Sequence, residues 1–260
     1  MDSSVIGVLG KGRWGSSLIC GLRHLNFTVA AAGRADFSRI SRFKSWVGRC
    51  SVLCLAVQDD QLGPVISRLE SLSLAGKTIL IHSGTQPLTL LSTLAEKGAV
   101  IGKFHALQAF TQASDQPPPP GTPFAFEGDI HSLVHPWVQG WKGLLHEVRG
   151  EEWARYHLAA VTSANFLAFL IRGGAEILAP LAGDRAGALT WLAPLVRHSV
   201  EAALDPENQK PYSGPAIRGD TQVMARQKEL LALWAPHLLP LYEEASDALQ
   251  RLDKDQSTKP

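Results

Sequence analysis

Residues 5–15 read VIGVLGKGRWG, a short apolar run followed at once by three glycines. The run is typical of a buried strand, and residues 16–25 have the composition of a helix. In the pattern Gly10-x-Gly12-x-x-Gly15, the first glycine permits a tight turn, the second lets backbone amides approach a pyrophosphate, and the third allows the helix to pack closely on the strand. This order predicts a dinucleotide-binding site, with a purely structural glycine turn as the alternative.

The sequence also indicates which dinucleotide is bound. Arg13 and Trp14 precede the expected helix and would offer backbone N–H groups to an anion, which the N-terminus of the helix also attracts. An NAD-binding protein usually presents an acidic residue at the end of its second strand. Here that strand runs into Arg34 instead. Arg34, with Arg39 or Arg42, could pair with a 2′-phosphate, which favours NADP(H); a solvated basic helix face is the alternative.

The pattern of apolar residues changes once along the chain. Through the first 105 residues, short apolar runs alternate with amphipathic stretches of helix length, which is typical of a parallel sheet with crossover helices. From Glu152 the segments are long and rich in Ala and Leu, which predicts a bundle of helices. We therefore expect an α/β protein with a Rossmann-like sheet domain at 1–150, an all-α substrate and dimerisation domain at 151–252, and a disordered polar tail at 253–260. The expected strands are 5–9, 27–32, 51–57, 77–82 and 99–104, with a further short run at 123–129.

Composition excludes several classes of partner. The 25 Lys and Arg residues nearly balance the 24 Asp and Glu residues, so no overall field attracts nucleic acid or an anionic membrane. The three cysteines form neither a disulfide framework nor a zinc motif, and His131 and His135 have no third ligand nearby, so we expect no metal. The longest apolar stretch, 158–171, is interrupted by polar residues, and no secretion signal is evident. The sequence predicts a cytoplasmic protein.

Several phrases carry a resemblance to a known family. They are HSG at 82–84, LAVQDDQL at 55–62, FHALQAF at 104–110, YHLAAVTSANF at 156–166 and SGPAIRGD at 213–220. Together they make the chain similar, as far as about Tyr242, to the bacterial family that joins a Rossmann-like domain to domain of unknown function 2520. The chain departs from that family at Gln58 and Ala106, where the family has proline. The family itself resembles ketopantoate reductase, pyrroline-5-carboxylate reductase and the hydroxyacid dehydrogenases.

The resemblance implies a homodimeric, NADPH-dependent oxidoreductase that reduces a small carboxylate-bearing ketone or imine, with ketopantoate as the named example. It implies that Ala56, Val57 and Gln58 lie beside the nicotinamide, at the carboxyl end of a strand. Hydroxyacid dehydrogenases commonly place Lys and Asn four residues apart on the first long helix after the nucleotide domain. If Asn165 is that Asn, Val161 occupies the Lys position. The missing Lys motivates the alternative of a catalytically inactive NADP(H)-binding regulator or sensor.

A reductase needs a group that protonates or polarises the forming alkoxide or amine. His157, one turn before Val161, could supply that proton, or could simply pack at the start of its helix. Ser83 and His105 end strands on the side where such sheets bind ligands, so they are further candidates. The alternatives are turn chemistry for the serine and a partly exposed strand end for the histidine.

Two polar residues of the helical part complete the set of candidates. Asn165 lies among apolar neighbours, which indicates either a site residue or a buried hydrogen bond between helices. The guanidinium of Arg218 could hold a substrate carboxylate, or could pair with Asp220 or Glu176. Asp220 precedes an expected helix and is predicted to cap its free amides.

Overall fold

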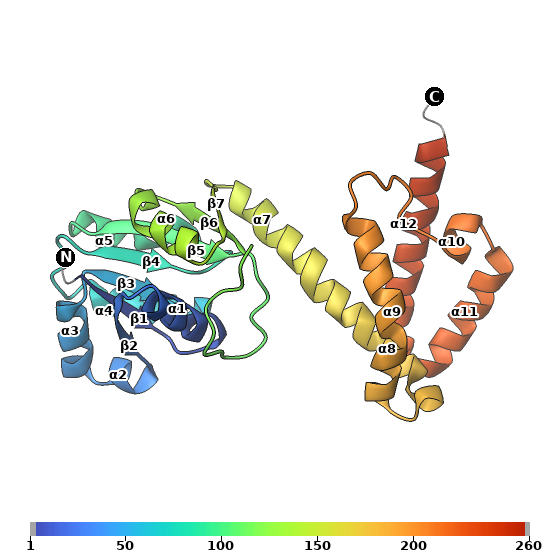
Figure 1. Cartoon of the computed structure of the whole chain (residues 1–260), viewed down its shortest axis with the longest axis horizontal. Helices are drawn as coiled ribbons and strands as arrows, with labels where there is room; N and C mark the ends of the chain where they lie inside the picture. Colours follow the sequence, from blue (N-terminus) through green and yellow to red (C-terminus); the bar gives the residue numbers. More distant parts are fainter. Residues whose placement is uncertain (1–3, 258–260) are drawn as a thin grey trace. The chain divides into compact units, whose positions relative to one another are not determined.

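The computed structural model describes residues 4–257, which fall into two compact units divided between Val161 and Thr162 (Figure 1). The first unit contains a seven-stranded sheet with the order β2-β1-β3-β4-β5-β6-β7. Neighbouring strands run parallel except β5 and β6, which are antiparallel. The strands are β1 (Val5–Leu9), β2 (Thr28–Ala32), β3 (Val52–Leu55), β4 (Thr78–Ile81), β5 (Val100–Ala106), β6 (Pro123–Glu127) and β7 (Leu144–Glu147).

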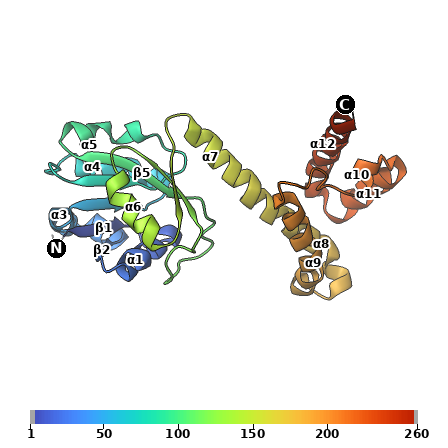
Figure 2. The same cartoon turned by 45° about the horizontal axis from the view of Figure 1, so that its top comes forward.

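Helices cover both faces of this sheet, as the two apolar faces of its buried strands require (Figures 1 and 2). On one face, α3, α4 and α5 enclose a core that includes Trp46, Leu62 and Leu94. On the other face, α1 and α6 contribute Leu18 and Trp137 to a second core. The helices of this unit are α1 (Arg13–His24), α2 (Arg34–Ser38), α3 (Ile40–Arg49), α4 (Asp59–Leu69), the 3₁₀ helix η1 (Leu88–Leu91), α5 (Ser92–Glu96), α6 (His131–Gly140) and α7 (Glu152–Ala160).

The second unit is helical. Its helices α8 and α9 form a hairpin that turns at Gly183, and the side chain of Asp184 caps α9 by accepting a hydrogen bond from the Gly187 amide at 2.7 Å. A small core around Leu231 and Leu238 joins the later helices. The elements are the π-helix η2 (Val161–Phe166), which begins at the division, α8 (Leu167–Ala182), α9 (Arg185–Leu204), α10 (Pro215–Arg218), α11 (Thr221–Trp234), the 3₁₀ helix η3 (Pro236–Leu238) and α12 (Leu239–Ser257).

The α/β class, the Rossmann-like sheet and the helical C-terminal part are confirmed. The division of the structure lies eleven residues beyond the expected boundary at 150, because α7 packs on the sheet: Trp153 is buried, and the hydroxyl of Tyr156 lies 3.1 Å from Nδ1 of His105. The expectation of a disordered tail is wrong for residues 253–257, which continue α12, and residues 258–260 lie outside the described part. Between Pro240 and Pro260 the sequence has no glycine or proline, so no such residue ends that helix earlier.

Within residues 4–257, one continuous helical stretch, Glu152–Ala182, is long and apolar enough to cross a membrane by length and composition alone. It includes α7, the π-helix and α8. Much of its apolar surface within α8 is exposed, as at Phe169 and Leu170.

Candidate functional site

The glycine turn lies between β1 and α1, as its sequence predicts. Gly10 has a φ of +110°, and a Cβ built on it would lie 2.1 Å from the carbonyl oxygen of Ala56. A Cβ on Gly15 would lie 2.2 Å from the carbonyl oxygen of Gly10, so both positions bring backbone against backbone. Around Gly12 the space is open. Since α1 begins at Arg13, the first amides of the helix face this open side of the turn.

Most of the predicted cofactor residues line one pocket of about 580 Å³ beside the turn, which we call the glycine-turn pocket. It contains two guanidinium groups, those of Arg13 and Arg34, and none of its described lining residues is acidic. An anion is therefore favoured there over a cation. The lining residues are Leu9, Gly10, Gly12, Arg13, Gly33, Arg34, Phe37, Ala56, Val57, Gln58, Gln61 and Val65.

The other two predicted cofactor residues, Trp14 and Gly15, are not among the lining residues of this pocket, and they lie in the first turn of α1. The indole of Trp14 turns away into the core, where its ring centroid lies 5.0 Å from that of Phe110 and 5.7 Å from that of His82. Its backbone amide stays in the first turn of α1. The side chain of Trp14 thus fixes the start of the helix while its N–H remains available to a ligand.

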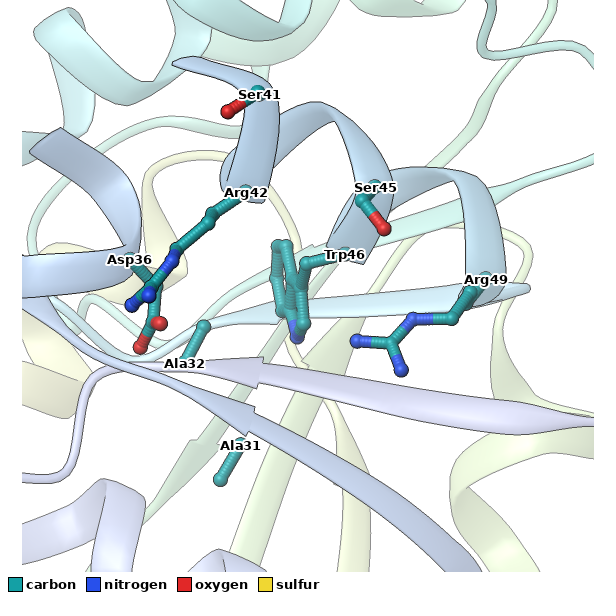
Figure 3. Close-up of a pocket in the computed structure, with 8 residues that line it drawn as sticks. All are labelled: Ala31, Ala32, Asp36, Ser41, Arg42, Ser45, Trp46 and Arg49. Atoms are coloured by element: carbon teal, nitrogen blue, oxygen red, sulfur yellow. The ribbon is translucent and has the colours of Figure 1, made fainter. Parts of the chain in front are cut away.

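The basic residues after β2 separate into two groups. Arg34 lines the glycine-turn pocket, whereas Arg42 lines a second pocket of about 350 Å³ together with Trp46 and Arg49 (Figure 3). In Figure 3 the guanidinium of Arg42 lies near Asp36, whose carboxylate accepts a hydrogen bond from the Gly33 amide at 3.0 Å. Of the three arginines predicted to pair with a 2′-phosphate, Arg34 is the one that the glycine-turn pocket contains.

Ser83 organises the loop after β4. Its hydroxyl donates to a carboxylate oxygen of Asp59 at 2.9 Å and accepts from the amides of Thr85 and Gln86 at 3.1 and 2.9 Å. Thr85 also donates to Asp59, at 2.5 Å. Asp59 begins α4 directly after Gln58, so this cluster connects the loop to the edge of the glycine-turn pocket. These contacts agree with the alternative given above, in which Ser83 stabilises a tight turn.

His82, which precedes this loop, is a core residue. Its ring is buried, and Nδ1 lies 2.7 Å from the carbonyl oxygen of Phe104. Burial lowers the pKa of His82 to about 3, so its imidazole is neutral at physiological pH.

His105 and His157 meet at the next strand end. Their ring centroids are 6.4 Å apart. The hydroxyl of Tyr156, which precedes His157 on α7, lies 3.1 Å from Nδ1 of His105 and so connects α7 to β5. Burial, with the neighbouring His157 and Lys103, lowers the pKa of His105 to about 4, so this ring is neutral. A Cβ on Gly84 would lie 2.3 Å from the ring of His157, so the ring occupies the space that a side chain at position 84 would take.

His157 lines a pocket of about 560 Å³ between the loop after β4 and α7, which we call the α7 pocket. Its walls are largely apolar, and a few ionisable groups converge on it, a combination typical of small-molecule sites. The lining residues are Gly84, Thr85, Pro87, Leu88, Thr89, Lys103, Glu127, Gly150, Glu151, Trp153, Ala154, His157, Leu158 and Val161.

Sequence reasoning missed Lys103, which contributes to this pocket from the middle of β5. Its Nζ donates to the carbonyl oxygen of Gln86 at 2.8 Å and lies 3.8 Å from the ring centroid of Trp153. Burial lowers the pKa of Lys103 to about 8, although the carboxylates of Glu127 and Asp59 act in the opposite direction. A lysine inside an apolar strand was the available signal, because unpaired charges are rarely buried.

The remaining candidates lie in the second unit, and their roles stay predictions. Asn165 is exposed on the π-helix, so the expected buried hydrogen bond is not what accounts for it. Arg218 pairs with Asp220, at 2.9 Å from Nε and 2.8 Å from the terminal nitrogen. Asp220 occupies the N-cap position of α11, but the prediction that its side chain caps the helix amides is wrong, since its carboxylate binds Arg218 instead. Glu176, the other suggested partner, lies 3.9 Å from Arg185.

The described residues contain no group of three side chains suited to a metal ion. His131 and His135 lie on α6 with ring centroids 5.1 Å apart.

Several proteins of known structure share the fold of this chain. A proposed NADP oxidoreductase from Bacteroides fragilis has a similar structure, with a TM-score of 0.75 and 17% identity over 95% of this chain and 98% of that one. An imine reductase from Streptomyces aurantiacus has a TM-score of 0.62 and 14% identity, over 98% of this chain and 100% of that one. A pyrroline carboxylate reductase from Plasmodium falciparum, solved with NADP bound, has a TM-score of 0.57 and 14% identity, over 97% of this chain and 99% of that one.

These likenesses establish a shared fold. A search of curated proteins finds no match. Residues 122–249 match the family described as "Domain of unknown function (DUF2520)", a match that begins at β6 and continues into α12. The C-terminal part of the chain, residues 122–249, therefore belongs to the family defined by domain of unknown function 2520, and strands β1 to β5 of the Rossmann-like sheet precede it.

Proposed function

We propose that this protein is an NADP(H)-dependent oxidoreductase that reduces the C=O or C=N bond of a small carboxylate-bearing ketone or imine. The observation that carries the proposal is the glycine-turn pocket, which combines open helix amides with Arg13 and Arg34 and has no acid among its described lining residues. Such a pocket suits a pyrophosphate and a ribose 2′-phosphate. The similar fold of the proposed NADP oxidoreductase, and of the pyrroline carboxylate reductase solved with NADP bound, supports the same cofactor.

The cofactor would supply the hydride, and the chain would bind it, orient the acceptor and provide a proton. Gly10, Gly12 and Arg13 would hold the pyrophosphate. Ala56 and Gln58 follow β3 at the carboxyl edge of the sheet, where the nicotinamide is expected. The glycine turn and this strand end share one pocket, which supports a single continuous dinucleotide site.

His157 is the proposed proton donor. It lines the α7 pocket next to the Gly84 turn, and imidazole is a competent acid near neutrality. His105 is neutral and bonded to Tyr156, so its proposed role is to help hold the ring of His157 and the loop in place. Ser83 would act through the loop it organises. For a carboxylate-bearing acceptor, Arg218 and Asn165 are the candidates from the helical unit.

The first experiment is a fluorescence titration with NADPH and NADH. We expect tighter binding of NADPH, and we expect Arg34→Ala to remove the difference between the two while Arg42→Ala, from the second pocket, preserves it. A panel of 2-oxoacids, including ketopantoate, and cyclic imines is then screened for oxidation of bound NADPH. Failure to bind either nucleotide would refute the proposal.

A catalytically inactive NADP(H) sensor is the second candidate. Val161 motivates it, because a superfamily lysine is expected at that position and the residue present cannot donate a proton. Tight NADPH binding without turnover across the whole panel would favour the sensor. Turnover that His157→Ala abolishes would favour the reductase.

We also propose a soluble, cytoplasmic homodimer that forms through the helical unit. A groove of about 910 Å³ runs along α8 and α9, with Phe166, Leu170 and Leu195 among its exposed apolar residues. An apolar surface of this kind is usually covered by another protein chain. Light scattering of the purified chain without detergent tests this: a dimer mass supports it, whereas a requirement for detergent would indicate that the Glu152–Ala182 helix inserts into a membrane.

A further inference from the structure

Lys103 is among the largest fully buried side chains of the protein, with 1% of its surface exposed. It lies in β5, where alternation places it on the same face as Ile101 and His105. A buried ammonium group is expensive unless its hydrogens find acceptors. Its contacts therefore indicate what it does.

The ammonium group joins three separate elements. From β5 it donates to the carbonyl oxygen of Gln86 at 2.8 Å and lies within 3.5 Å of that of Gly84, both in the loop after β4. On its other side it lies over the indole of Trp153, 3.8 Å from the ring centroid, in the first turn of α7. A cation over an aromatic ring and two carbonyl contacts account for its three hydrogens.

The two elements that the ammonium group holds, the loop after β4 and α7, are also the elements that carry Gly84 and His157, whose ring lies against Gly84. Trp153 and His157 are four residues apart, so they project from the same face of α7. Gly84 is one of the two loop residues whose carbonyls the ammonium contacts. We propose that Lys103 is a positioning residue, which fixes His157 against the Gly84 turn at the wall of the α7 pocket. The importance of this position rests on the proposed reductase function, but its test does not.

The charges around the ammonium explain why it remains a cation at neutral pH. Glu127 faces it from β6 and Asp59 from α4, and both carboxylates raise the pKa of Lys103, while burial holds it at about 8. His105 on its own strand and His157 on α7 are the other titratable neighbours. An uncharged side chain of similar length would fill the same space without desolvating a charge. Positioning accounts for the presence of the lysine, whereas stability alone does not.

Hydrogen exchange of the full-length chain tests the proposal without any substrate. In Lys103→Met we expect the amides of Thr85 and Gln86, which donate to Ser83, and those of the first turn of α7 to exchange roughly tenfold faster at pH 7. Lys103→Arg keeps a cation and several donors, so exchange should stay within about threefold of the wild type. Lys97→Met, at an exposed lysine that ends α5, is the matched control.

Two results would overturn the proposal: unchanged exchange at Thr85 and Gln86 in Lys103→Met, or faster exchange spread over the whole sheet, which would indicate a merely structural lysine. Trp153→Leu removes the indole that contacts the ammonium group and leaves Lys103 intact. In this variant the amides of the first turn of α7 should also exchange faster than in the wild type. NADPH titration of each variant is the parallel control. If the wild type binds no NADPH, the proposed function fails, yet the exchange result still decides whether Lys103 positions His157.

Discussion

Replacing Lys103 by Met is expected to stabilise the folded protein at neutral pH and destabilise it, relative to wild type, at alkaline pH. In the fold the pKa of Lys103 falls from 10.5 to about 8, chiefly because of burial. At about 1.4 kcal/mol per pKa unit, the charged form disfavours folding by roughly 3 kcal/mol below pH 8. Met removes this cost but also loses two hydrogen bonds worth about 1 kcal/mol each. At pH 7 the variant should therefore be more stable by about 1 kcal/mol.

The pH dependence has a definite sign. Between pH 8 and 10.5 the unfolded chain binds the proton that the folded chain has lost, so the wild-type free energy of unfolding rises with pH, by roughly 3 kcal/mol in all. The Met variant lacks this rise. The neutral amine still donates its hydrogen bonds, so wild type should be the more stable protein by about 2 kcal/mol at pH 10.5, with the two curves crossing near pH 9.

Urea unfolding at pH 7, 8, 9 and 10, followed by tryptophan fluorescence, measures this difference. Other lysines and tyrosines titrate in the same range, but they do so equally in both proteins and cancel in the difference. Lys97→Met should run parallel to wild type at every pH, because that side chain is exposed. If the difference in free energy of unfolding between Lys103→Met and wild type stays constant from pH 7 to 10, burial of the charged ammonium does not destabilise the fold as assumed.

Three further outcomes are expected. Arg34→Ala should weaken NADPH binding by about tenfold or more in a fluorescence titration and leave NADH binding unchanged, with Arg42→Ala as the control; equal losses for both nucleotides would argue against a 2′-phosphate contact. Gly84→Ala should reduce turnover while NADPH still binds, because the new Cβ would lie 2.3 Å from the ring of His157, and undiminished turnover would remove His157 from the reaction. Ser83→Ala should lower the free energy of unfolding by about 1–3 kcal/mol in urea titrations, since two loop amides lose their acceptor; a change under 0.5 kcal/mol would mean that water replaces the hydroxyl.

The sequence predicts the first five strands because each is a short apolar run between turn residues, and buried parallel strands require that pattern. It does not predict β7 (Leu144–Glu147), a largely exposed strand at the edge of the sheet, where no face has to be apolar. The glycine turn could be predicted from the sequence for a related reason. Its three glycines stand close together in the sequence, directly after an apolar run, and at Gly10 and Gly15 the backbone leaves no room for a side chain.

The surroundings of His157 could not be derived in this way. Tyr156 bonds to His105, and Trp153 lies over Lys103, about fifty residues away in the chain, so these contacts exist only once α7 packs on the sheet. The same packing assigns α7 to the first unit. Local propensity also failed at Asp220, where an ion pair with Arg218 replaced the expected cap.

The contacts at Gly10 and Gly15 change how mutagenesis of this turn should be interpreted. At both positions an added Cβ would meet a backbone carbonyl, which cannot rotate away as a side chain can. Loss of nucleotide binding in Gly10→Ala or Gly15→Ala would thus report a distorted strand–helix junction, whether or not a ligand ever touches it. Gly12 has open space around it, so among the three glycines its substitution is the one that measures contact with the ligand itself.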